Sequence, residues 1–172
     1  MGDRSVPIYT SDVLGVADTY RRTLADTSPD PTDVGDYSTE ELARWKNLNS
    51  FVARFMRNEP VIWLYLPLWQ LRKALEEPQN SRKLTECLLW VASEWIVQCA
   101  GPIFNEMSSN TDLDESDARV FRTGPLCDAE LLSVERWQFW KKRFSDLVIA
   151  GVDTGVAGHV SAALRSIEAA EG

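Results

Sequence analysis

The stretch LTECLLWVASEWIVQC, residues 84–99, decides the fold class of this chain. Placed at about 100° per residue, as in an α-helix, its apolar side chains fill well over a third of the circumference. They are Leu84, Cys87, Leu88, Val91, Ala92, Trp95, Ile96 and Cys99. A helix with one covered face needs only a narrower stripe, so the sequence predicts that the helix at 81–100 packs on several sides at the centre of a helical domain.

Helical periodicity recurs along the rest of the chain and predicts helices over 11–25, 38–58, 60–77, 133–150 and 153–169. The motif STEE predicts a capping box, with Ser38 as N-cap and Glu41 three residues later. Pro60 suits the first turn of its helix, whereas Pro67 lies inside that helix and predicts a kink. No alternating strand pattern and no internal repeat occur. The sequence therefore predicts an all-α fold, a single domain over 1–172 built as a bundle of about six helices.

Three segments are predicted to be irregular: a flexible N-terminus at 1–10, a loop at 26–37 and a long acidic loop at 108–128. Loops as long as the last are uncommon in compact domains unless they are functional or disordered. Its run NTDLDESD lacks the glycine and the last acidic residue of an EF-hand, so we expect a solvated charge run. Gly101 and Pro102 predict a break or kink after the central helix, with helical structure continuing beyond it.

Composition restricts the classes of function. The net charge is −8 and the pI about 4.7, which argues against nucleic-acid binding and against docking on anionic membranes. The run PVIWLYLPLW covers only ten residues and is too short to span a bilayer. Three cysteines without a C-x-x-C pair do not form a disulfide framework, and they favour a reducing, cytoplasmic location.

The segment SVERWQFWKKRF, residues 133–144, combines aromatic and basic residues. On a helix with Ser133 as N-cap, Trp137 and Trp140 share an apolar face, so we expect these indoles to be core. We further expect Arg136 to anchor the loop before it through a carboxylate or a backbone carbonyl while its stem covers Trp140.

This segment, with GPLC before it and RWKNLNSFVARF upstream, resembles a fungal family, the domain of unknown function 3632. The resemblance spans about 40 to 150 and rests on Gly124, Pro125, Leu126, Arg136, Trp137, Trp140, Trp45, Asn47, Leu48, Phe51, Ala53 and Arg54. It implies a helical intracellular protein and no particular activity.

Catalytic candidates are few. Nucleotide-binding loops, nucleophile elbows and zinc motifs are absent, so we expect no cofactor and no metal. Glu94 lies on the less apolar side of the central helix, and we expect it to face solvent. If that side is buried instead, a raised pKa would suit Glu94 to acid–base chemistry. His159 is the single histidine and the second candidate.

Candidate ligand-binding residues are aromatic or are isolated polar residues on apolar faces: Asn49, Trp63, Trp69, Trp90, Arg136 and Trp140. For Asn49 we expect a structural hydrogen bond to a neighbouring helix end, with a ligand contact as the alternative. Two functions remain open. The first is a non-catalytic binding or scaffolding module with a protein partner. The second is a small enzyme or carrier that takes a small apolar ligand in an aromatic-lined pocket between helices, which requires an enclosed cavity near Trp63, Trp69 and Glu94.

Overall fold

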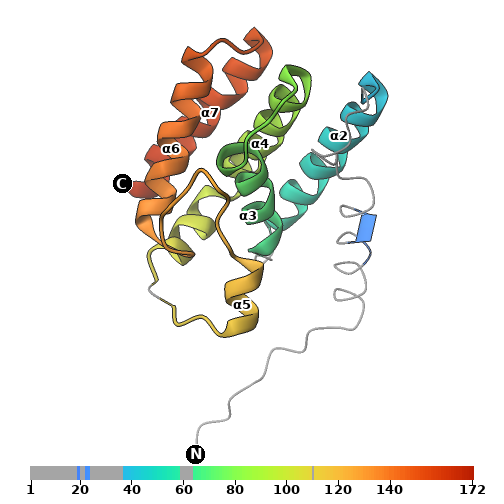
Figure 1. The fold of residues 1–172 in the computed structure, drawn as a ribbon. Coiled ribbons are helices and arrows are strands. Elements are labelled where there is room, and N and C mark those ends of the chain that lie inside the picture. Colours follow the sequence, from blue (N-terminus) through green and yellow to red (C-terminus); the bar gives the residue numbers. More distant parts are fainter. Residues whose placement is uncertain (1–18, 20–21, 24–36, 59–63, 110) are drawn as a thin grey trace, which may run out of the picture.

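The structure, a computed structural model, describes residues 19, 22–23, 37–58, 64–109 and 111–172. The elements within these residues, in chain order, are α2 (Thr39–Met56), α3 (Tyr65–Leu71), the π-helical turn η1 (Arg72–Glu76), α4 (Arg82–Met107), α5 (Glu115–Val120), α6 (Val134–Ile149) and α7 (Thr154–Glu171) (Figure 1). The described residues contain no strand, which confirms the all-α fold class. The N-terminal segment 1–10, nearly all of the predicted helix at 11–25 and the loop up to residue 36 lie outside the described residues.

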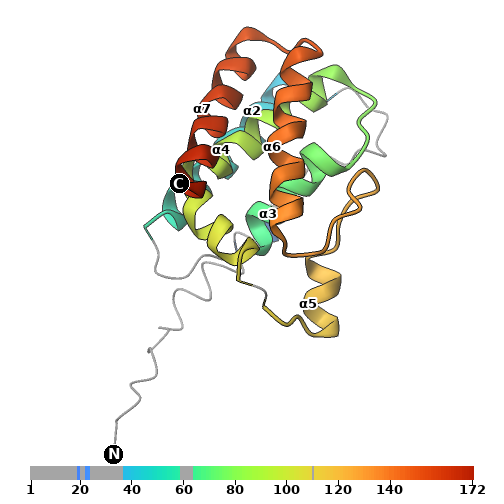
Figure 2. The same ribbon diagram turned by 90° about the vertical axis from the view of Figure 1, so that its left-hand side faces the viewer.

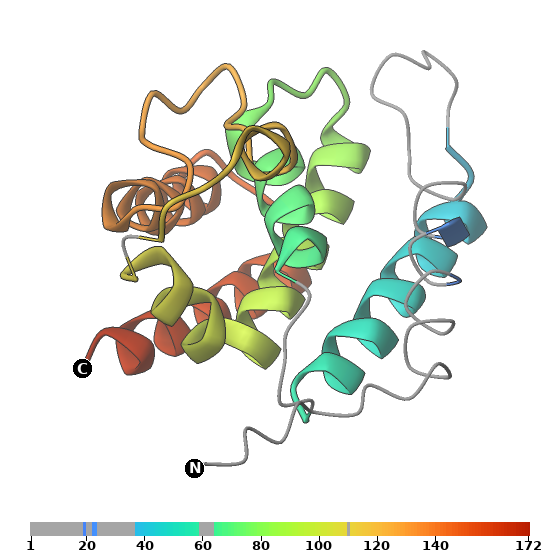
Figure 3. The same cartoon turned by 90° about the horizontal axis from the view of Figure 1, so that it is seen from below.

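The helix α4 is the centre of the bundle, as its wide apolar stripe predicts. It packs mainly against α7 and α2, which lie on either side of it (Figure 1), and it also contacts α6 and α3. The helices α2 and α6 lie on opposite sides of the molecule when it is seen from below (Figure 3). By length and composition α4 could cross a membrane, but 67% of its most apolar window is buried within the protein. Packing in the core is therefore a sufficient reason for its apolar character.

The predicted break near Gly101 is a kink in a continuous helix. Cys99 has non-helical dihedral angles, φ −131° and ψ 17°, and α4 continues through Pro102 to Met107. The proline ring cannot accommodate the carbonyl four residues earlier, so the helix bends just before it. The chain after Gly101 is helical, as predicted.

Side-chain caps fix where the helices α2, α4, α5, α6 and α7 begin. Ser38 Oγ accepts from Glu41 N and Glu41 Oε2 accepts from Ser38 N, which confirms the capping box. Ser133 caps α6, and Asp153 caps α7 through a bond from Gly155 N. These caps satisfy amide groups that have no partner inside the helix.

The kink expected at Pro67 involves the first turn of the helix predicted at 60–77, and residues 60–63 lie outside the described residues. The described helix α3 begins at Tyr65, so Pro67 lies in its first turn, where a missing amide donor costs nothing. The irregularity comes later, where α3 widens into the π-turn η1 that ends at Glu76. A π-turn adds a residue to the helical repeat, and this segment carries Glu76 into the core, where it is fully buried.

The loop predicted at 108–128 contains a short helix, α5, which the sequence reading missed. Asp114 caps it by accepting from Asp117 N at 2.8 Å. None of its residues is buried, so no apolar periodicity marks it. Figure 2 shows α5 projecting below α6, with the rest of the loop running back beside α3.

Candidate functional site

Arg136 does anchor the long loop, but its carboxylate partner comes from elsewhere. Its Nε donates to Glu76 Oε1 at 2.7 Å and its Nη2 to Glu76 Oε2 at 3.1 Å, across 60 residues of sequence. Its Nη1 donates at 2.6 Å to the carbonyls of Phe121 and Leu131, at the two ends of the loop segment before α6. The guanidinium lies over Trp140, 5.3 Å from the ring centroid. The acidic residues at 112–117, which the sequence offered as partners, take no part.

Glu76 is saturated by hydrogen-bond donors. Besides Arg136, Trp140 Nε1 donates to its Oε1 at 2.6 Å and Gly124 N to its Oε2 at 2.7 Å, while its backbone carbonyl accepts from Leu126 N at 2.9 Å. We call Glu76, Gly124, Arg136 and Trp140 the Glu76 cluster. Its charges are fully enclosed, with side-chain exposures of 1% for Arg136 and 0% for Glu76. With every partner in place it is structural, and neither Arg136 nor Trp140 is available to a ligand.

Asn49 also has a structural role. Its Oδ1 accepts from Trp95 Nε1 at 2.9 Å and its Nδ2 donates to the carbonyl of Trp45 at 3.0 Å. The first bond joins α2 to α4, as expected of a buried amide, although it meets a side chain rather than a helix end. Asn49 is fully buried and does not face a groove.

The structure brings together the two catalytic candidates. His159 Nε2, on α7, lies 3.1 Å from Glu94 Oε2, on α4. Ser50 on α2 donates to Glu94 Oε1 at 2.8 Å, and Arg54 Nε lies 3.4 Å from the same oxygen. The imidazole stacks on Trp90, with ring centroids 4.6 Å apart and an interplanar angle of 6°.

The expectation that Glu94 faces solvent is wrong, because α2 and α7 cover it to 3% exposure. Its pKa is not raised by this burial but lowered, because the His159 imidazole, then Ser50 and Arg54, favour the carboxylate and outweigh desolvation. Glu94 is therefore ionised at neutral pH and suited to be a base or an orienting group rather than an acid. The carboxylate lies between Ser50 and His159, so His159 does not take the Ser50 proton as in a serine triad.

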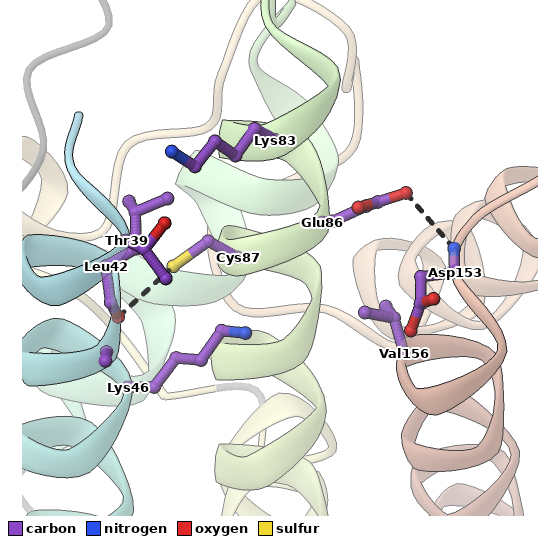
Figure 4. A pocket seen from close by; sticks show the side chains of 9 residues that line it. Thr39, Leu42, Lys46, Lys83, Glu86, Cys87, Asp153 and Val156 are labelled. Atoms are coloured by element: carbon purple, nitrogen blue, oxygen red, sulfur yellow. Dashed lines mark hydrogen bonds between the residues drawn. The ribbon is translucent and has the colours of Figure 1, made fainter. Parts of the chain in front are cut away.

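One groove lies where α2, α4 and α7 all begin (Figure 4). It has a volume of about 250 Å³, and we call it the helix-end groove. Lys46 and Lys83 lie on the side of α4 that faces α2, and Glu86 and Asp153 on the side that faces α7 (Figure 4). The lining also includes Cys87. Burial raises the pKa of Cys87 to about 11, so the thiol is neutral and unreactive.

A second groove, of about 290 Å³, contains the sequence candidate Trp69. Its lining is Trp69, Arg72, Arg119, Val120 and Arg122, and we call it the arginine groove. The indole donates from Nε1 to the carbonyl of Val120 at 3.0 Å, which ties α3 to the end of α5. Neither groove is lined by Glu94 or His159, and Trp63 lies outside the described residues.

Sequence reasoning missed Glu76, Ser50 and the arginines of the second groove. No local signal identifies Glu76, because a carboxylate two residues before a proline is typical of a solvated helix end. Ser50 lies beside Asn49, and two neighbouring polar residues close to the apolar arc of α2 were a usable signal of buried polar contacts. Within the part of the chain that the structure describes, no group of three or more His, Cys, Asp or Glu side chains is placed to hold a metal.

Comparison with known proteins gives one match. A family model described as "Protein of unknown function (DUF3632)" matches residues 11–144, which is more than half of the chain. No curated protein and no solved structure matches.

Proposed function

This chain belongs to the family of proteins of unknown function DUF3632, which transfers no activity to it, and we propose from its own geometry that it is a non-catalytic binding module. The arginine groove is its binding surface, and its partner is an acidic peptide segment. The observation that carries the proposal is that three arginines and a tryptophan line one open groove, on a protein whose net charge is −8. Such a local reversal of sign attracts anionic partners that the rest of the surface repels.

The existing contacts of the groove favour carboxylates as ligands. Arg72 Nε already binds Glu77 Oε1 at 2.8 Å, and Arg119 lies 3.8 Å from Glu115 in a highly exposed pair. Exposed pairs of this kind are weak, so a partner's carboxylate replaces Glu115 at little cost. The side chain of Arg122 is exposed and has no ion pair or hydrogen bond with any described residue, so it can engage a ligand directly.

The polar interior supports binding over catalysis. In the Glu76 cluster and around Asn49, hydrogen bonds within the protein occupy the groups that a pocket would use to hold a substrate. The alternative, an enzyme or a carrier for a small apolar ligand, needs an enclosed cavity that reaches Trp69 and Glu94. The two grooves are open to solvent, and neither contains both residues.

Acid–base catalysis remains the second candidate function, favoured by the 3.1 Å contact of Glu94 and His159. It requires a substrate beside the imidazole, which is 22% exposed and already stacked on Trp90. The binding proposal instead treats this contact as a tie between α4 and α7.

The test is a titration of isotope-labelled protein with an acetylated hexaglutamate peptide, followed by NMR. We expect shifts of the Trp69 indole N–H signal and of the arginine Nε–H signals of the groove, with affinity that falls as salt rises. Arg119→Gln and Arg122→Gln should each weaken binding by roughly tenfold, and Arg165→Gln, an exposed arginine on α7, should not. A peptide that shifts no groove signal, or an equal loss in the Arg165 control, would contradict the proposal.

A further inference from the structure

We propose that the helix-end groove is a second binding site, which takes a short zwitterionic peptide with both termini free. The ligand's carboxylate lies between Lys46 and Lys83, and its ammonium group lies against Asp153 and Glu86. The site is separate from the arginine groove and does not depend on it.

The distribution of charge carries this inference. The two lysines and the two carboxylates face the groove from opposite sides of α4 (Figure 4). An anion alone would meet Asp153 and Glu86, and a cation alone would meet the lysines. A ligand with separated charges of both signs satisfies the whole lining. Two extended residues span roughly 7 Å, which separates the charges of a dipeptide further than those of a single amino acid.

Each charged group keeps capacity for a ligand. An ammonium group has three hydrogen-bond donors, and Lys83 Nζ uses one of them to donate to the carbonyl of Tyr37 at 2.7 Å. Lys46 Nζ has no hydrogen bond or ion pair with a described residue and lies 5.6 Å from the Trp90 ring centroid. Asp153 uses Oδ1 to cap α7, through Gly155 N at 2.9 Å, and its Oδ2 has no partner among the described residues.

Glu86 is held in place toward α7. Its Oε1 accepts from Arg82 Nε at 3.0 Å and from Asp153 N at 3.1 Å, which fixes the carboxylate across the gap between α4 and α7. Its Oε2 has no partner among the described residues. The acidic half of the groove is thus positioned by the fold before any ligand arrives.

The direction of the helices favours the same ligand orientation. The helices α2, α4 and α7 begin at Thr39, Arg82 and Thr154, at one end of the bundle (Figure 1). Each contributes a partial positive charge there. Those of α2 and α4 add to the charge of the two lysines on the carboxylate side, whereas that of α7 faces its own cap, Asp153. The lining also includes the apolar residues Leu42, Cys87 and Val156, which suit a ligand with small aliphatic side chains. The Cys87 thiol is neutral and adds no competing negative charge.

The experiment is calorimetric titration of the full chain with the dipeptide Ala-Val and with two matched probes. N-acetyl-Ala-Val lacks the ammonium group, and Ala-Val-amide lacks the carboxylate. We expect Ala-Val to saturate the protein below about 10 mM, and each blocked form to bind roughly tenfold more weakly or worse. Amide signals of Thr39 and Gly155 should shift in NMR spectra with Ala-Val.

Two variants test the assigned groups without breaking the fold. Lys46→Met keeps the aliphatic stem, and Asp153→Asn keeps a competent N-cap for α7. Each should weaken Ala-Val binding by roughly tenfold, and Lys142→Met, on the exposed face of α6, should leave it unchanged. Absence of binding, equal binding of Ala-Val and either blocked form, or an equal loss in the Lys142 control would each overturn the proposal. None of these results bears on the arginine groove.

Discussion

Arg136 and Glu76 form an ion pair that is closed off from solvent, with Nε and Oε1 2.7 Å apart and side-chain exposures of 1% and 0%. The pair joins α6 to the end of η1, and through Phe121 and Leu131 it also holds both ends of the loop segment before α6. Such a pair is not by itself a gain over an apolar core, because both charges lose their hydration. Its effect is to fix the path of a long loop that has little regular structure.

Removal of one member of the pair should be severely destabilising. Arg136→Met leaves the Glu76 carboxylate buried without its main partner, and we expect a loss of about 3–5 kcal/mol in the free energy of unfolding. Urea unfolding followed by circular dichroism measures it. Arg44→Met, at an exposed arginine of α2, is the control and should change the free energy by no more than about 0.5 kcal/mol. A midpoint for Arg136→Met equal to that of the control would show that the pair is dispensable.

Arg136→Lys should loosen the loop even where the protein still folds. Lysine has one ammonium group and does not bind Glu76 and the loop carbonyls in the planar arrangement of a guanidinium. Arg136 Nη2 lies 3.4 Å from the carbonyl of Arg122, in the bond that trypsin would cut. We expect faster tryptic cleavage after Arg122 in Arg136→Lys than in the unmodified protein or in Lys142→Arg. Equal rates in all three would rule out the anchoring role.

Gly124→Ala should disrupt the Glu76 cluster from the opposite side. A Cβ at position 124 would lie 2.6 Å from the Glu76 carbonyl oxygen and 2.8 Å from its Cβ. Neither atom is the far end of a flexible side chain, so the loop must move away and the bond from Gly124 N to Glu76 lengthens. Gly158→Ala is the matched control, because nothing lies within 4 Å of a Cβ there. Thermal unfolding should show a lower midpoint for Gly124→Ala and a gain of about 0.5–1 kcal/mol for Gly158→Ala, inside helix α7.

Trp137→Ala should cost about 3–5 kcal/mol of stability, because the indole is completely buried. It packs on Phe104 with centroids 5.3 Å apart, and its Nε1 donates to Glu171 Oε1 at 3.0 Å. The same truncation at Phe51, which is 54% exposed, should cost far less. Denaturant unfolding of both variants gives the comparison, and similar losses would contradict a core role for Trp137.

The Glu94 carboxylate should stabilise the folded protein in its ionised form, so the effect of removing its charge should depend on pH. The pKa of Glu94 is lowered by the His159 imidazole, Ser50 and Arg54, so its contribution is present above the ordinary value of 4.5 and is lost as pH falls through the lower folded value. The stability difference between the unmodified protein and Glu94→Gln should therefore be largest near neutral pH and shrink below pH 4.5. Denaturant unfolding of both proteins from about pH 3 to about pH 7 measures this difference. A difference that grows on acidification would contradict the lowered pKa.

Within the described residues, the sequence by itself determined which of the longer segments are helical and where the main apolar face of each lies. The capping box at Ser38, the cap Ser133 and the stripe of α4 involve residues within four positions of each other, and helix formation is decided at that range. The burial of Trp137 and Trp140 follows from the same periodicity. Among the described elements, α5 and the π-turn η1 were not predicted. The short helix α5 is exposed and has no apolar face to mark it, and η1 lies inside a segment predicted to be an ordinary helix.

Tertiary structure alone decided the partners of the polar residues. Periodicity places Glu94 on one side of α4, but only the packing of α2 and α7 buries that side and brings His159 to the carboxylate. Likewise the sequence predicts an anchoring contact for Arg136 but does not identify Glu76 as its partner. Glu76 lies 60 residues earlier, at the end of a π-turn that was not predicted. The arginine groove combines Trp69 and Arg72 with Arg119 and Arg122 from a distant loop. A charged side chain has no preferred spacing to its partner along the sequence, so these pairings exist only once the helices have packed.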